Sequence, residues 1–444
     1  MNNDAYQIKG GKKIKGEINL SGAKNAALKL IIASLLFNHK VILENIPHIK
    51  DIENLLKLIN NLGVKVKFVD KNIIEIDPLT LNHNQVDLFY GSKVRVSFML
   101  FAPLLYHFGE CYIPNPGGCR IGTRPIDRIV CGMESLGIKV EYSPQTGYYH
   151  AQMSKKPSGY YSFSKPSHTG TELLIMLSVF SNNEVVIDNA SQEPEIDNLI
   201  DFLNQAGAKI RREEKKIIIQ GVKKLSLKKP FKTIYDRNEA VTYATLALAS
   251  KGEVTINHIH PSLISYFLEK VKKTGNVYEI LKDNKIKFIG QNNFQAVDVE
   301  TGPHPGFMTD WQPHWAVLMT QAKGISVIHE RVFENRFAYV DQLKKLGAKI
   351  EFFQPNIKQP QDFYYFNYLP QNRYYQAIKI YGQKKLHGGV LDIYDLRTGA
   401  SLVIAGLIAQ GETIINGTHI LERGYEDIVK KITALDGRIK KISL

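Results

Sequence analysis

The residues best suited to chemistry lie in one short segment, Asn115–Asp127, with the sequence NPGGCRIGTRPID. Cys119 stands between two glycines and two arginines, Arg120 and Arg124. Nearby cations lower the pKa of a thiol, and a bound phosphorylated ligand would oppose that effect and restore the protonated form. We therefore expect this cysteine to deliver a proton to a substrate carbon or to attack it, with a passive loop cysteine as the alternative.

Basic and hydroxyl side chains recur at the starts of apolar segments. A lysine at a helix N-terminus opposes the macrodipole, which favours anions there, so lysine and free N–H groups together could hold a phosphate. Taken singly, each such residue is explained as a cap, a turn or a surface residue, and Ser21 or Gly22 is the expected cap of the first helix. Their recurrence favours one polyanion site. The residues concerned are Lys24, Asn25, Arg95, Lys165, Ser167, His168, Thr169 and Arg397.

A carboxylate and two further arginines stand out in the C-terminal half. Asp310, in the phrase TGPHPGFMTDWQPHW, could cap the helix that follows or act as the general base for a hydroxyl. Arg336 and Arg423 could bind an anion. Alternatively, they could form ion pairs with the neighbouring Glu334 and Glu426. We expect these groups to matter only if the fold brings them to the same place.

The elements that must position these residues repeat six times, about 70 residues apart. A short phrase, glycine followed by a small or branched residue and then often a basic and a β-branched one, closes each copy. The last interval is longer because it contains a Tyr-, Gln- and Pro-rich stretch at 353–378, which we expect to be an inserted loop or hairpin. The glycines are Gly63, Gly137, Gly207, Gly275, Gly347 and Gly437.

Each copy has the same internal order. An apolar segment comes first, and because it is apolar on nearly every side we expect a helix buried all round. A β-rich run follows, then an amphipathic helix that the glycine ends at its C′ position. The pattern predicts an α/β fold of six units. Two groups of three copies, each a ring of sheets around buried helices, would satisfy this burial, although periodicity alone does not fix the grouping. The apolar segments are 26–37, 97–108, 172–180, 240–250, 314–322 and 400–410.

Length and composition limit the class of protein. The chain has 444 residues, of which 44% are hydrophobic, and this length predicts two domains. No apolar run approaches the roughly 18 residues of a membrane span, and the N-terminus lacks a secretory apolar core. Three cysteines allow no full disulfide framework and have no metal-binding spacing. We expect a reduced, cytoplasmic protein without a metal.

The net charge of +14 is compatible with a polyanionic partner. The densest basic patches are short and lack interleaved aromatic residues, and a long basic arm is absent from the sequence. This distribution argues against binding to nucleic acid or to a membrane. It favours lysines that simply lie on solvent-exposed faces of the protein. A non-catalytic repeat scaffold that binds polyanions through its basic surface stays as an alternative.

Seven phrases, in order along almost the whole chain, resemble those of the enolpyruvyl transferases, and among them the members that use UDP-N-acetylglucosamine. The resemblance implies two inside-out α/β barrel domains with pseudo-threefold symmetry, residues 22–234 and residues 1–21 plus 235–444. The phrases are GEINLSGAKNAAL, PGGCRIGTRPID, EPEID, GPHPGFMTDWQ, VFENRF, DLRTGASLV and LERGYEDI.

The resemblance also implies the reaction. The carboxyvinyl group of phosphoenolpyruvate would pass to the 3′-hydroxyl of UDP-N-acetylglucosamine, phosphate would leave, and no cofactor or metal would take part. This is the first committed step of peptidoglycan synthesis, so roles in cell shape, cell division and the cell cycle, and a fosfomycin-sensitive thiol, are implied too. Nucleic acid and membrane are not expected partners, and a monomer is compatible with the sequence.

The family implies roles for individual residues. Cys119 would donate the proton and form an adduct with phosphoenolpyruvate, Asp310 would be the base, and Asn25 would polarise the reacting centre. Lys24, Arg124 and Arg423 would hold the phosphate, with Arg336 and Arg397 near the carboxylate. The nucleotide-sugar contacts would be Arg95, Arg124, Pro125, Ile126, Asp127, Arg128, Lys165, Ser167, His168 and Val332.

The sequence departs from the family in places. SHTGTE, with His168 and Thr169, stands where many members have Ser-Val-Gly-Ala-Thr, and Arg128-Ile129 replaces an apolar–His pair of some relatives. These departures affect the acceptor site rather than the chemistry. Two enzymatic alternatives follow: transfer to shikimate 3-phosphate, which Cys119 argues against, and transfer to another uridine nucleotide.

Overall fold

The computed structural model describes residues 4–117 and 125–443, so Cys119 and Arg124 lie outside the described residues. The described residues form two compact units. The N-terminal-half unit comprises residues 22–117 and 125–234, and the C-terminal-half unit comprises residues 4–21 and 235–443.

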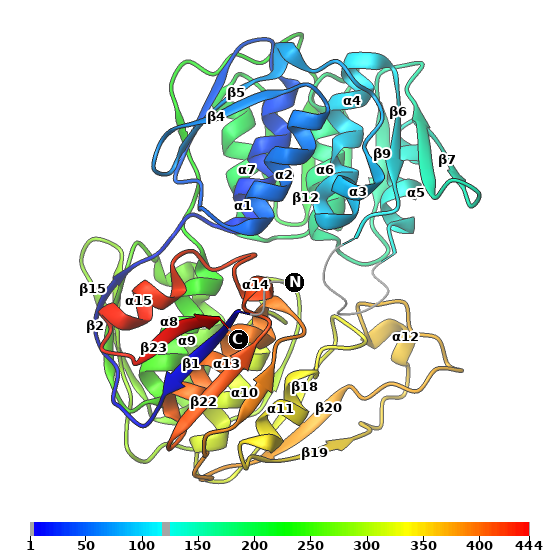
Figure 1. Cartoon of the computed structure of the whole chain (residues 1–444). Coiled ribbons are helices and arrows are strands. Elements are labelled where there is room, and N and C mark those ends of the chain that lie inside the picture. Colours follow the sequence, from blue (N-terminus) through cyan, green and yellow to red (C-terminus); the bar gives the residue numbers. More distant parts are fainter. Residues whose placement is uncertain (1–3, 118–124, 444) are drawn as a thin grey trace. The chain divides into compact units, whose positions relative to one another are not determined.

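The N-terminal-half unit contains three copies of the repeat around buried helices (Figure 1). The buried helices are α1 (Lys24–Ala33, continued by η1, Ser34–Leu36), η3 with α4 (Arg95–Leu100 and Phe101–Phe108) and α6 (His168–Ser178). The outer helices are α2 (Lys50–Asn61), α5 (Asp127–Ser135) and α7 (Pro194–Gln205), with the short α3 (Leu88–Lys93) and η2 (Pro78–Thr80).

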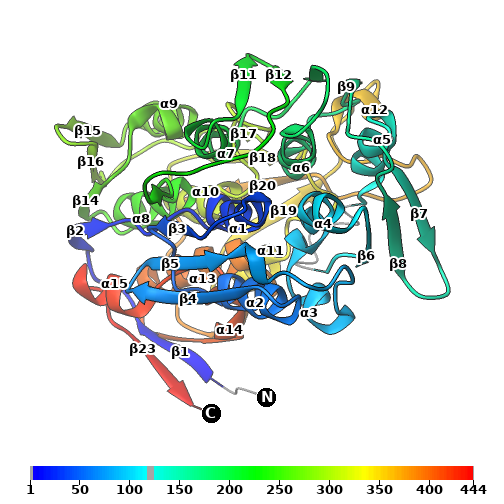
Figure 2. The same cartoon turned by 90° about the horizontal axis from the view of Figure 1, so that it is seen from above.

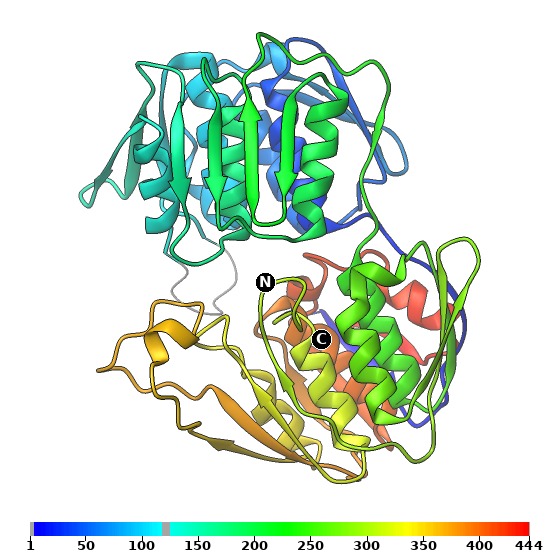
Figure 3. The same cartoon turned by 180° about the vertical axis from the view of Figure 1, so that it is seen from behind.

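Three sheets cover these helices, and Figure 3 shows one of them, coloured teal to green, with helices behind it. Their strand orders are β13-β3-β5-β4, β6-β8-β7 and β11-β12-β10-β9. The strands are β3 (Val41–Glu44), β4 (Lys65–Asp70), β5 (Ile73–Asp77), β6 (Glu110–Pro114), β7 (Lys139–Ser143), β8 (Tyr148–Gln152), β9 (Gly159–Ser162), β10 (Val185–Asp188), β11 (Lys209–Glu213), β12 (Lys216–Gln220) and β13 (Phe231–Lys232).

The C-terminal-half unit repeats this plan. Its buried helices are α8 (Arg237–Ala249), α10 (Gln312–Gln321) and α13 (Leu396–Ile408). Its other helices are η4 (Pro261–Ile264), α9 (Ser265–Thr274), α11 (Tyr339–Lys345), α12 (Pro360–Phe363), α14 (Thr418–Leu421) and α15 (Ile428–Ala434).

Its sheets have the strand orders β15-β16-β14-β2, β17-β18-β20-β19 and β21-β22-β1-β23. The strands are β1 (Asp4–Lys9), β2 (Lys15–Asn19), β14 (Glu253–Asn257), β15 (Val277–Leu281), β16 (Lys285–Ile289), β17 (Val299–Glu300), β18 (Ile325–His329), β19 (Lys349–Phe353), β20 (Ala377–Tyr381), β21 (Val390–Asp392), β22 (Glu412–Asn416) and β23 (Ile439–Ser443).

All six apolar segments form helices with buried side chains, which confirms the α/β class and the order of elements within each copy. Each helix is apolar around its circumference because sheets and neighbouring helices enclose it. The second copy enters its helix through the 3₁₀ turn η3, and Pro103 lies within the first turn of α4, where a missing N–H leaves no bond unmade.

The closing glycines adopt the conformation that the sequence predicts in five copies. Gly63 has φ +93° and Gly347 has φ +92°, in the left-handed region that favours glycine at a helix C-terminus. In the sixth copy the prediction is wrong. Asp436, with φ +67°, adopts the left-handed conformation at the end of the helix, and Gly437 is the next residue. A Cβ at Gly437 would lie 2.4 Å from Ile432, so close packing is the reason for that glycine.

The first strand of the chain belongs to the last sheet. In five sheets the strand after the buried helix pairs with the second strand after the outer helix, whereas in the sixth β22 pairs with β1. The other edge of β1 pairs antiparallel with β23, and Figures 1 and 2 show the two strands side by side. The sixth copy is thus completed by residues from the opposite end of the sequence.

Four helix starts differ from expectation. The N-cap of α1 is Ala23, and not Ser21 or Gly22. Ser21 instead donates its hydroxyl to Glu426 and accepts a hydrogen bond from Lys431. Arg95, His168 and Arg397 lie within the first turns of η3, α6 and α13 rather than before them.

The insertion at 353–378 is the long connection of a hairpin, because β19 and β20 pair antiparallel on either side of it. It contains α12 and a small cluster of Tyr364, Phe366 and Tyr374, which are all buried. The insertion therefore has an aromatic core of its own.

Among the described residues, no helix is long and apolar enough to cross a membrane, and no group of three or more His, Cys, Asp or Glu side chains could hold a metal ion. Cys111 is buried and Cys131 is exposed, and both are free thiols.

Candidate functional site

Three of the residues selected from the sequence meet in the C-terminal-half unit. Arg336 Nη2 lies 2.7 Å from Asp310 Oδ1, and Arg397 Nε lies 3.2 Å from Asp310 Oδ2. Both arginines are buried, each 3% exposed, whereas Asp310 is half-buried. One carboxylate therefore holds two buried guanidinium groups near solvent, which is the arrangement of an anion site with an internal counter-ion.

Two alternatives from the sequence are wrong: Asp310 is not the cap of the following helix, and Arg336 does not pair with Glu334. The N-cap of α10 is Trp311, and Asp310 directs its carboxylate to the two arginines. The Arg336 guanidinium pairs with Asp310 and Asp395 rather than with Glu334.

Asp395 is the residue that fixes the arginines. Its carboxylate accepts hydrogen bonds from the backbone N–H groups of Arg397 (3.0 Å) and Thr398 (3.1 Å), so it caps α13. The same Oδ1 lies 3.0 Å from Arg336 Nη1. A single helix cap therefore positions one arginine through its backbone and the other through its side chain.

Behind Arg397 lies a buried chain of hydrogen bonds. Arg397 Nη1 donates to the Tyr425 hydroxyl at 3.1 Å, and that hydroxyl lies 2.8 Å from Thr242 Oγ1, which is 3.0 Å from His314 Nε2. Burial, together with the charge of Arg397, lowers the pKa of His314 to about 3, so this imidazole is neutral at ordinary pH. The network anchors Arg397 without adding a second positive charge.

The other two candidates of this unit lie on nearby loops. The backbone N–H of Val332 donates to Glu330 Oε1 at 2.7 Å, and Glu330 is fully buried. Burial raises the pKa of the Glu330 carboxyl, although the N–H groups of Val332 and Phe333 oppose the rise. Arg423 lies half-buried in the turn that follows α14.

In the N-terminal-half unit, Lys24 opens α1 and pairs with Asp51 on α2 at 3.0 Å. The side chains of Lys24 and Asp51 are 12% and 7% exposed. Asn25 follows in the first turn of α1 and is half-buried. A lysine thus lies at the positive end of this helix, where Asp51 balances its charge.

Residues 125–128 follow the undescribed residues in sequence, and Arg95 contacts a residue that precedes them. Arg95 Nη1 donates to the carbonyl of Pro116 at 3.4 Å. Pro125 is exposed and Ile126 is the buried N-cap of α5, with Asp127 and Arg128 in its first turn. The carbonyl of Arg128 accepts a hydrogen bond from Tyr161 at 2.7 Å.

The start of α6 holds the remaining candidates. Ser167 caps the helix by accepting a hydrogen bond from the N–H of Gly170 at 3.2 Å, as the sequence predicts. Lys165 lies half-buried before it. His168, the first residue of α6, lies 3.2 Å from the fully buried Glu172.

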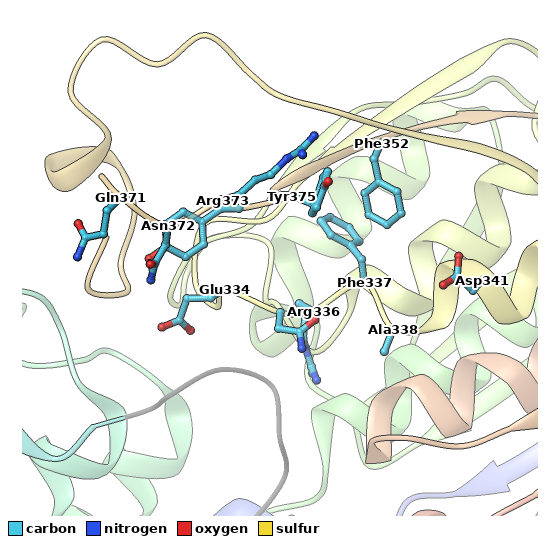
Figure 4. A pocket seen from close by; sticks show the side chains of 12 residues that line it. Glu334, Arg336, Phe337, Ala338, Asp341, Phe352, Gln371, Asn372, Arg373 and Tyr375 are labelled. Atoms are coloured by element: carbon cyan, nitrogen blue, oxygen red, sulfur yellow. The ribbon is translucent and has the colours of Figure 1, made fainter. Parts of the chain in front are cut away.

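A cavity of about 650 Å³ opens elsewhere in the C-terminal-half unit, between 334–341 and 371–375 of the insertion. Phe337, Phe352 and Tyr375 lie along one side of it (Figure 4). Among the candidates that the structure describes, only Arg336 lines it, and its guanidinium is engaged with Asp310 and Asp395. We therefore treat this cavity as separate from the arginine–carboxylate cluster.

Sequence reasoning missed the residues that hold the candidates in place. Asp395, Tyr425 and Asp51 carry no signal except their position beside a candidate or at a helix start. The sequence does contain a signal for Lys29 and Glu172, because both are charged residues inside segments that are otherwise apolar.

Comparison with known proteins identifies the family of the chain. The model of the EPSP synthase (3-phosphoshikimate 1-carboxyvinyltransferase) family matches residues 8–432. A UDP-N-acetylglucosamine 1-carboxyvinyltransferase of Bartonella henselae is 38% identical, covering 99% of this chain and 100% of that protein. The protein named UDP-N-acetylglucosamine 1-carboxyvinyltransferase 1 in Clostridium acetobutylicum is 37% identical, covering 98% of this chain and 99% of that protein.

Solved structures share the fold. The enolpyruvyl transferase NikO from Streptomyces tendae has a TM-score of 0.85 at 17% identity and covers both chains completely. EPSP synthase from Acinetobacter baumannii has a TM-score of 0.75 at 16% identity, covering 99% of this chain and 100% of that chain. By its match to the family model and to full-length relatives, the chain belongs to the EPSP synthase family of enolpyruvyl transferases.

Proposed function

We propose that this enzyme transfers the carboxyvinyl group of phosphoenolpyruvate to the 3′-hydroxyl of UDP-N-acetylglucosamine and releases phosphate, the first committed step of peptidoglycan synthesis. The observation that carries the proposal is the full-length identity of 35–38% to proteins named for this activity. The cluster of buried arginines around Asp310 supports it, because the two substrates together carry about five negative charges.

Asp310 is the proposed base for the sugar hydroxyl. Both of its oxygens are engaged by arginines in this structure, so a base role requires one of them to be released. An incoming substrate carboxylate would supply a new partner for Arg336 or Arg397 and free one oxygen of Asp310. Substrate binding would then switch the carboxylate from counter-ion to proton acceptor.

Lys24, Arg124 and Arg423 are the proposed phosphate ligands, and Asn25 polarises the reacting centre. Asp51 keeps the Lys24 ammonium at the start of α1, where the backbone N–H groups also favour an anion. The acceptor's contacts are proposed to be Arg95, residues 124–128, Lys165, Ser167, His168 and Val332.

Cys119 is the proposed proton donor to the methylene carbon of phosphoenolpyruvate. The thiol proton passes to that carbon, and the carbon bearing the phosphate takes up either the sugar hydroxyl or the cysteine sulfur. In the adduct, the new carbon–sulfur bond accompanies protonation of the methylene group. In the addition product with the sugar, Asp310 has accepted the hydroxyl proton. The Cys119 thiolate then takes one proton back from the new methyl group, the carbon–carbon double bond forms again, and the carbon–oxygen bond to phosphate breaks so that phosphate is expelled.

The proposal extends to three finer points. Each unit would be an inside-out α/β barrel of three copies, which the repeated order of strands within the sheets supports. The enzyme would act in the cytoplasm and affect cell shape and division through wall synthesis. The thiol of Cys119 would be the target of fosfomycin.

The decisive experiment measures phosphate release from phosphoenolpyruvate with each candidate acceptor. We expect release to depend on UDP-N-acetylglucosamine and to be absent with shikimate 3-phosphate. C119S is expected to reduce turnover by about 10³-fold, because the proton donor is lost. C131S is the matched control, since Cys131 is an exposed free thiol outside the proposed chemistry, and it should keep wild-type turnover.

Release that responds only to shikimate 3-phosphate would overturn the choice of acceptor. Intact-mass analysis gives an independent check, with fosfomycin adding once to the wild-type chain and to C131S but not to C119S when the nucleotide sugar is present.

A further inference from the structure

One buried threonine joins the three central helices of the C-terminal-half unit. The helices α8, α10 and α13 pack against one another (Figure 1). Thr242 Oγ1 on α8 lies 3.0 Å from His314 Nε2 on α10 and 2.8 Å from the Tyr425 hydroxyl. That hydroxyl accepts a hydrogen bond from Arg397 on α13, and all four side chains are buried. Each copy in this unit therefore contributes its central helix to one polar contact in the core.

The donors and acceptors around Thr242 fix the direction of each hydrogen bond. A hydroxyl donates one hydrogen and accepts two, and the Thr242 hydroxyl donates to the carbonyl of Asn238 at 2.9 Å. Its two acceptor positions are filled by the Tyr425 hydroxyl and by His314 Nε2, so both of these groups donate. Because Tyr425 has then used its only hydrogen, it presents an oxygen lone pair to Arg397.

The same geometry selects one tautomer of His314. The pKa of this imidazole, lowered by burial to about 3, leaves it a single ring proton at ordinary pH. Its Nδ1 atom has no hydrogen-bond partner among the described residues. A proton on Nδ1 would therefore be a buried N–H without an acceptor, which is rare and costly, whereas a proton on Nε2 is donated to Thr242.

These contacts hold Arg397 at two points. Its Nε donates to Asp310 and its Nη1 donates to Tyr425, which together fix the plane of the guanidinium. In the proposed mechanism, the contact with Asp310 is released when a substrate carboxylate binds. Tyr425 is then the remaining partner, and it also lies two residues after Arg423, a proposed phosphate ligand.

We propose that Thr242 and His314 are positioning residues for Arg397, and that they act by fixing the direction in which the Tyr425 hydroxyl points its hydrogen. With this hydrogen committed to Thr242, the tyrosine oxygen keeps hold of the guanidinium when Asp310 is released. A reversed hydroxyl would place its hydrogen against an N–H donor and push the arginine away. The proposal rests on the proposed function and adds two residues of the core to the machinery for the donor substrate.

The first test compares T242V with T242S in the phosphate-release assay. Valine has nearly the shape of threonine but no hydroxyl, so Tyr425 and His314 lose their acceptor, whereas serine keeps it. We expect T242V to lower kcat/KM for phosphoenolpyruvate about ten-fold and to leave KM for UDP-N-acetylglucosamine within about two-fold. T242S should stay within about two-fold of the wild type in both.

T245V is the matched control for burial and helix position. Thr245 is buried three residues further along α8, and its hydroxyl has no hydrogen-bond partner in the part of the chain that the structure describes. The substitution makes the same chemical change in the same helix without touching the contacts of Arg397. It should keep wild-type kinetics.

The second test separates positioning from a general effect on the fold. In an R397K background there is no guanidinium for Tyr425 to orient. T242V should therefore lower kcat/KM about ten-fold in the wild type but by less than about two-fold in R397K, because the two residues act as one unit. A purely structural role would give the same factor in both backgrounds. If T242V does not fold, Y425F replaces it, since it removes the oxygen that accepts from Arg397.

The third test examines the proton arrangement without measuring turnover. NMR of the enzyme with ¹⁵N-labelled histidine rings, in which H314Q identifies the signal of His314, should show the ring proton on Nε2 at neutral pH. H314Q keeps an N–H donor and should stay within about three-fold of wild-type kcat/KM. H314L has no donor and should lose more than H314Q.

Wild-type kinetics in T242V, equal factors in the wild-type and R397K backgrounds, or a His314 proton on Nδ1 would overturn the proposal. Phosphate release that does not depend on UDP-N-acetylglucosamine would instead overturn the proposed function. In that case the NMR measurement would still report whether the hydrogen bonds around Thr242 have the inferred direction.

Discussion

Asp310 illustrates what single residues contribute to this enzyme. Its carboxylate and that of Asp395 together balance the charges of two buried guanidinium groups, and in the proposed mechanism a substrate anion takes the place of Asp310. The sequence predicted the identity of these three residues through family phrases. It could not predict that they meet, because Arg397 belongs to a different copy of the repeat from Asp310 and Arg336, and only the fold brings the two copies together.

The residue-scale prediction concerns Arg397. Its Nε and Nη1 make separate contacts with Asp310 and Tyr425, and a lysine cannot make both. R397K should lower kcat/KM for phosphoenolpyruvate by about 10²-fold, as measured by phosphate release. R438K, at an exposed position of the same unit, should stay within about two-fold of the wild type. Wild-type kinetics in R397K would contradict a role for this arginine in binding or stabilising the donor.

At the scale of elements, the repeat determines where each helix ends. Five copies use glycine in the left-handed conformation, and the sixth uses Asp436 one residue earlier than the sequence phrase indicated. The helices and the strands that follow them were predictable from periodicity and from these phrases. The helix caps were harder to predict. The N-cap of α1, Ala23, has no side-chain acceptor, and Ser21 forms hydrogen bonds with charged groups instead.

The element-scale prediction compares two substitutions at Asp436. A left-handed backbone suits glycine and is costly for alanine, so D436G should be more stable than D436A by about 1 kcal/mol. Both variants remove the exposed ion pair with Lys12, so this contribution cancels in the comparison. Urea unfolding measures the difference, and equal midpoints would show that the strain at this helix end is negligible.

On the scale of the whole molecule, some strands pair with partners that lie far away in the sequence. β2 precedes α1 in the chain but pairs with β14, while β13 precedes α8 but pairs with β3. Family resemblance predicted the division into residues 22–234 and the remainder. Periodicity alone could not, because a repeat of about 70 residues is compatible with any grouping of its copies.

The whole-molecule prediction addresses β1. Ile8 is fully buried between β22 and β23, whereas Gln7 faces outward and donates to Glu412. I8A should therefore lower the free energy of unfolding by about 2–5 kcal/mol, and Q7A should lower it by less than about 1 kcal/mol. Equal losses in thermal or urea unfolding would mean that β1 contributes little to the core.

The position of β1 has a consequence for biosynthesis. Translation delivers this strand first, yet neither of its partners exists until the ribosome has passed residue 416 for β22 and residue 443 for β23. The nascent chain must therefore keep an early, partly apolar segment unpaired while the contiguous 22–234 unit folds behind it.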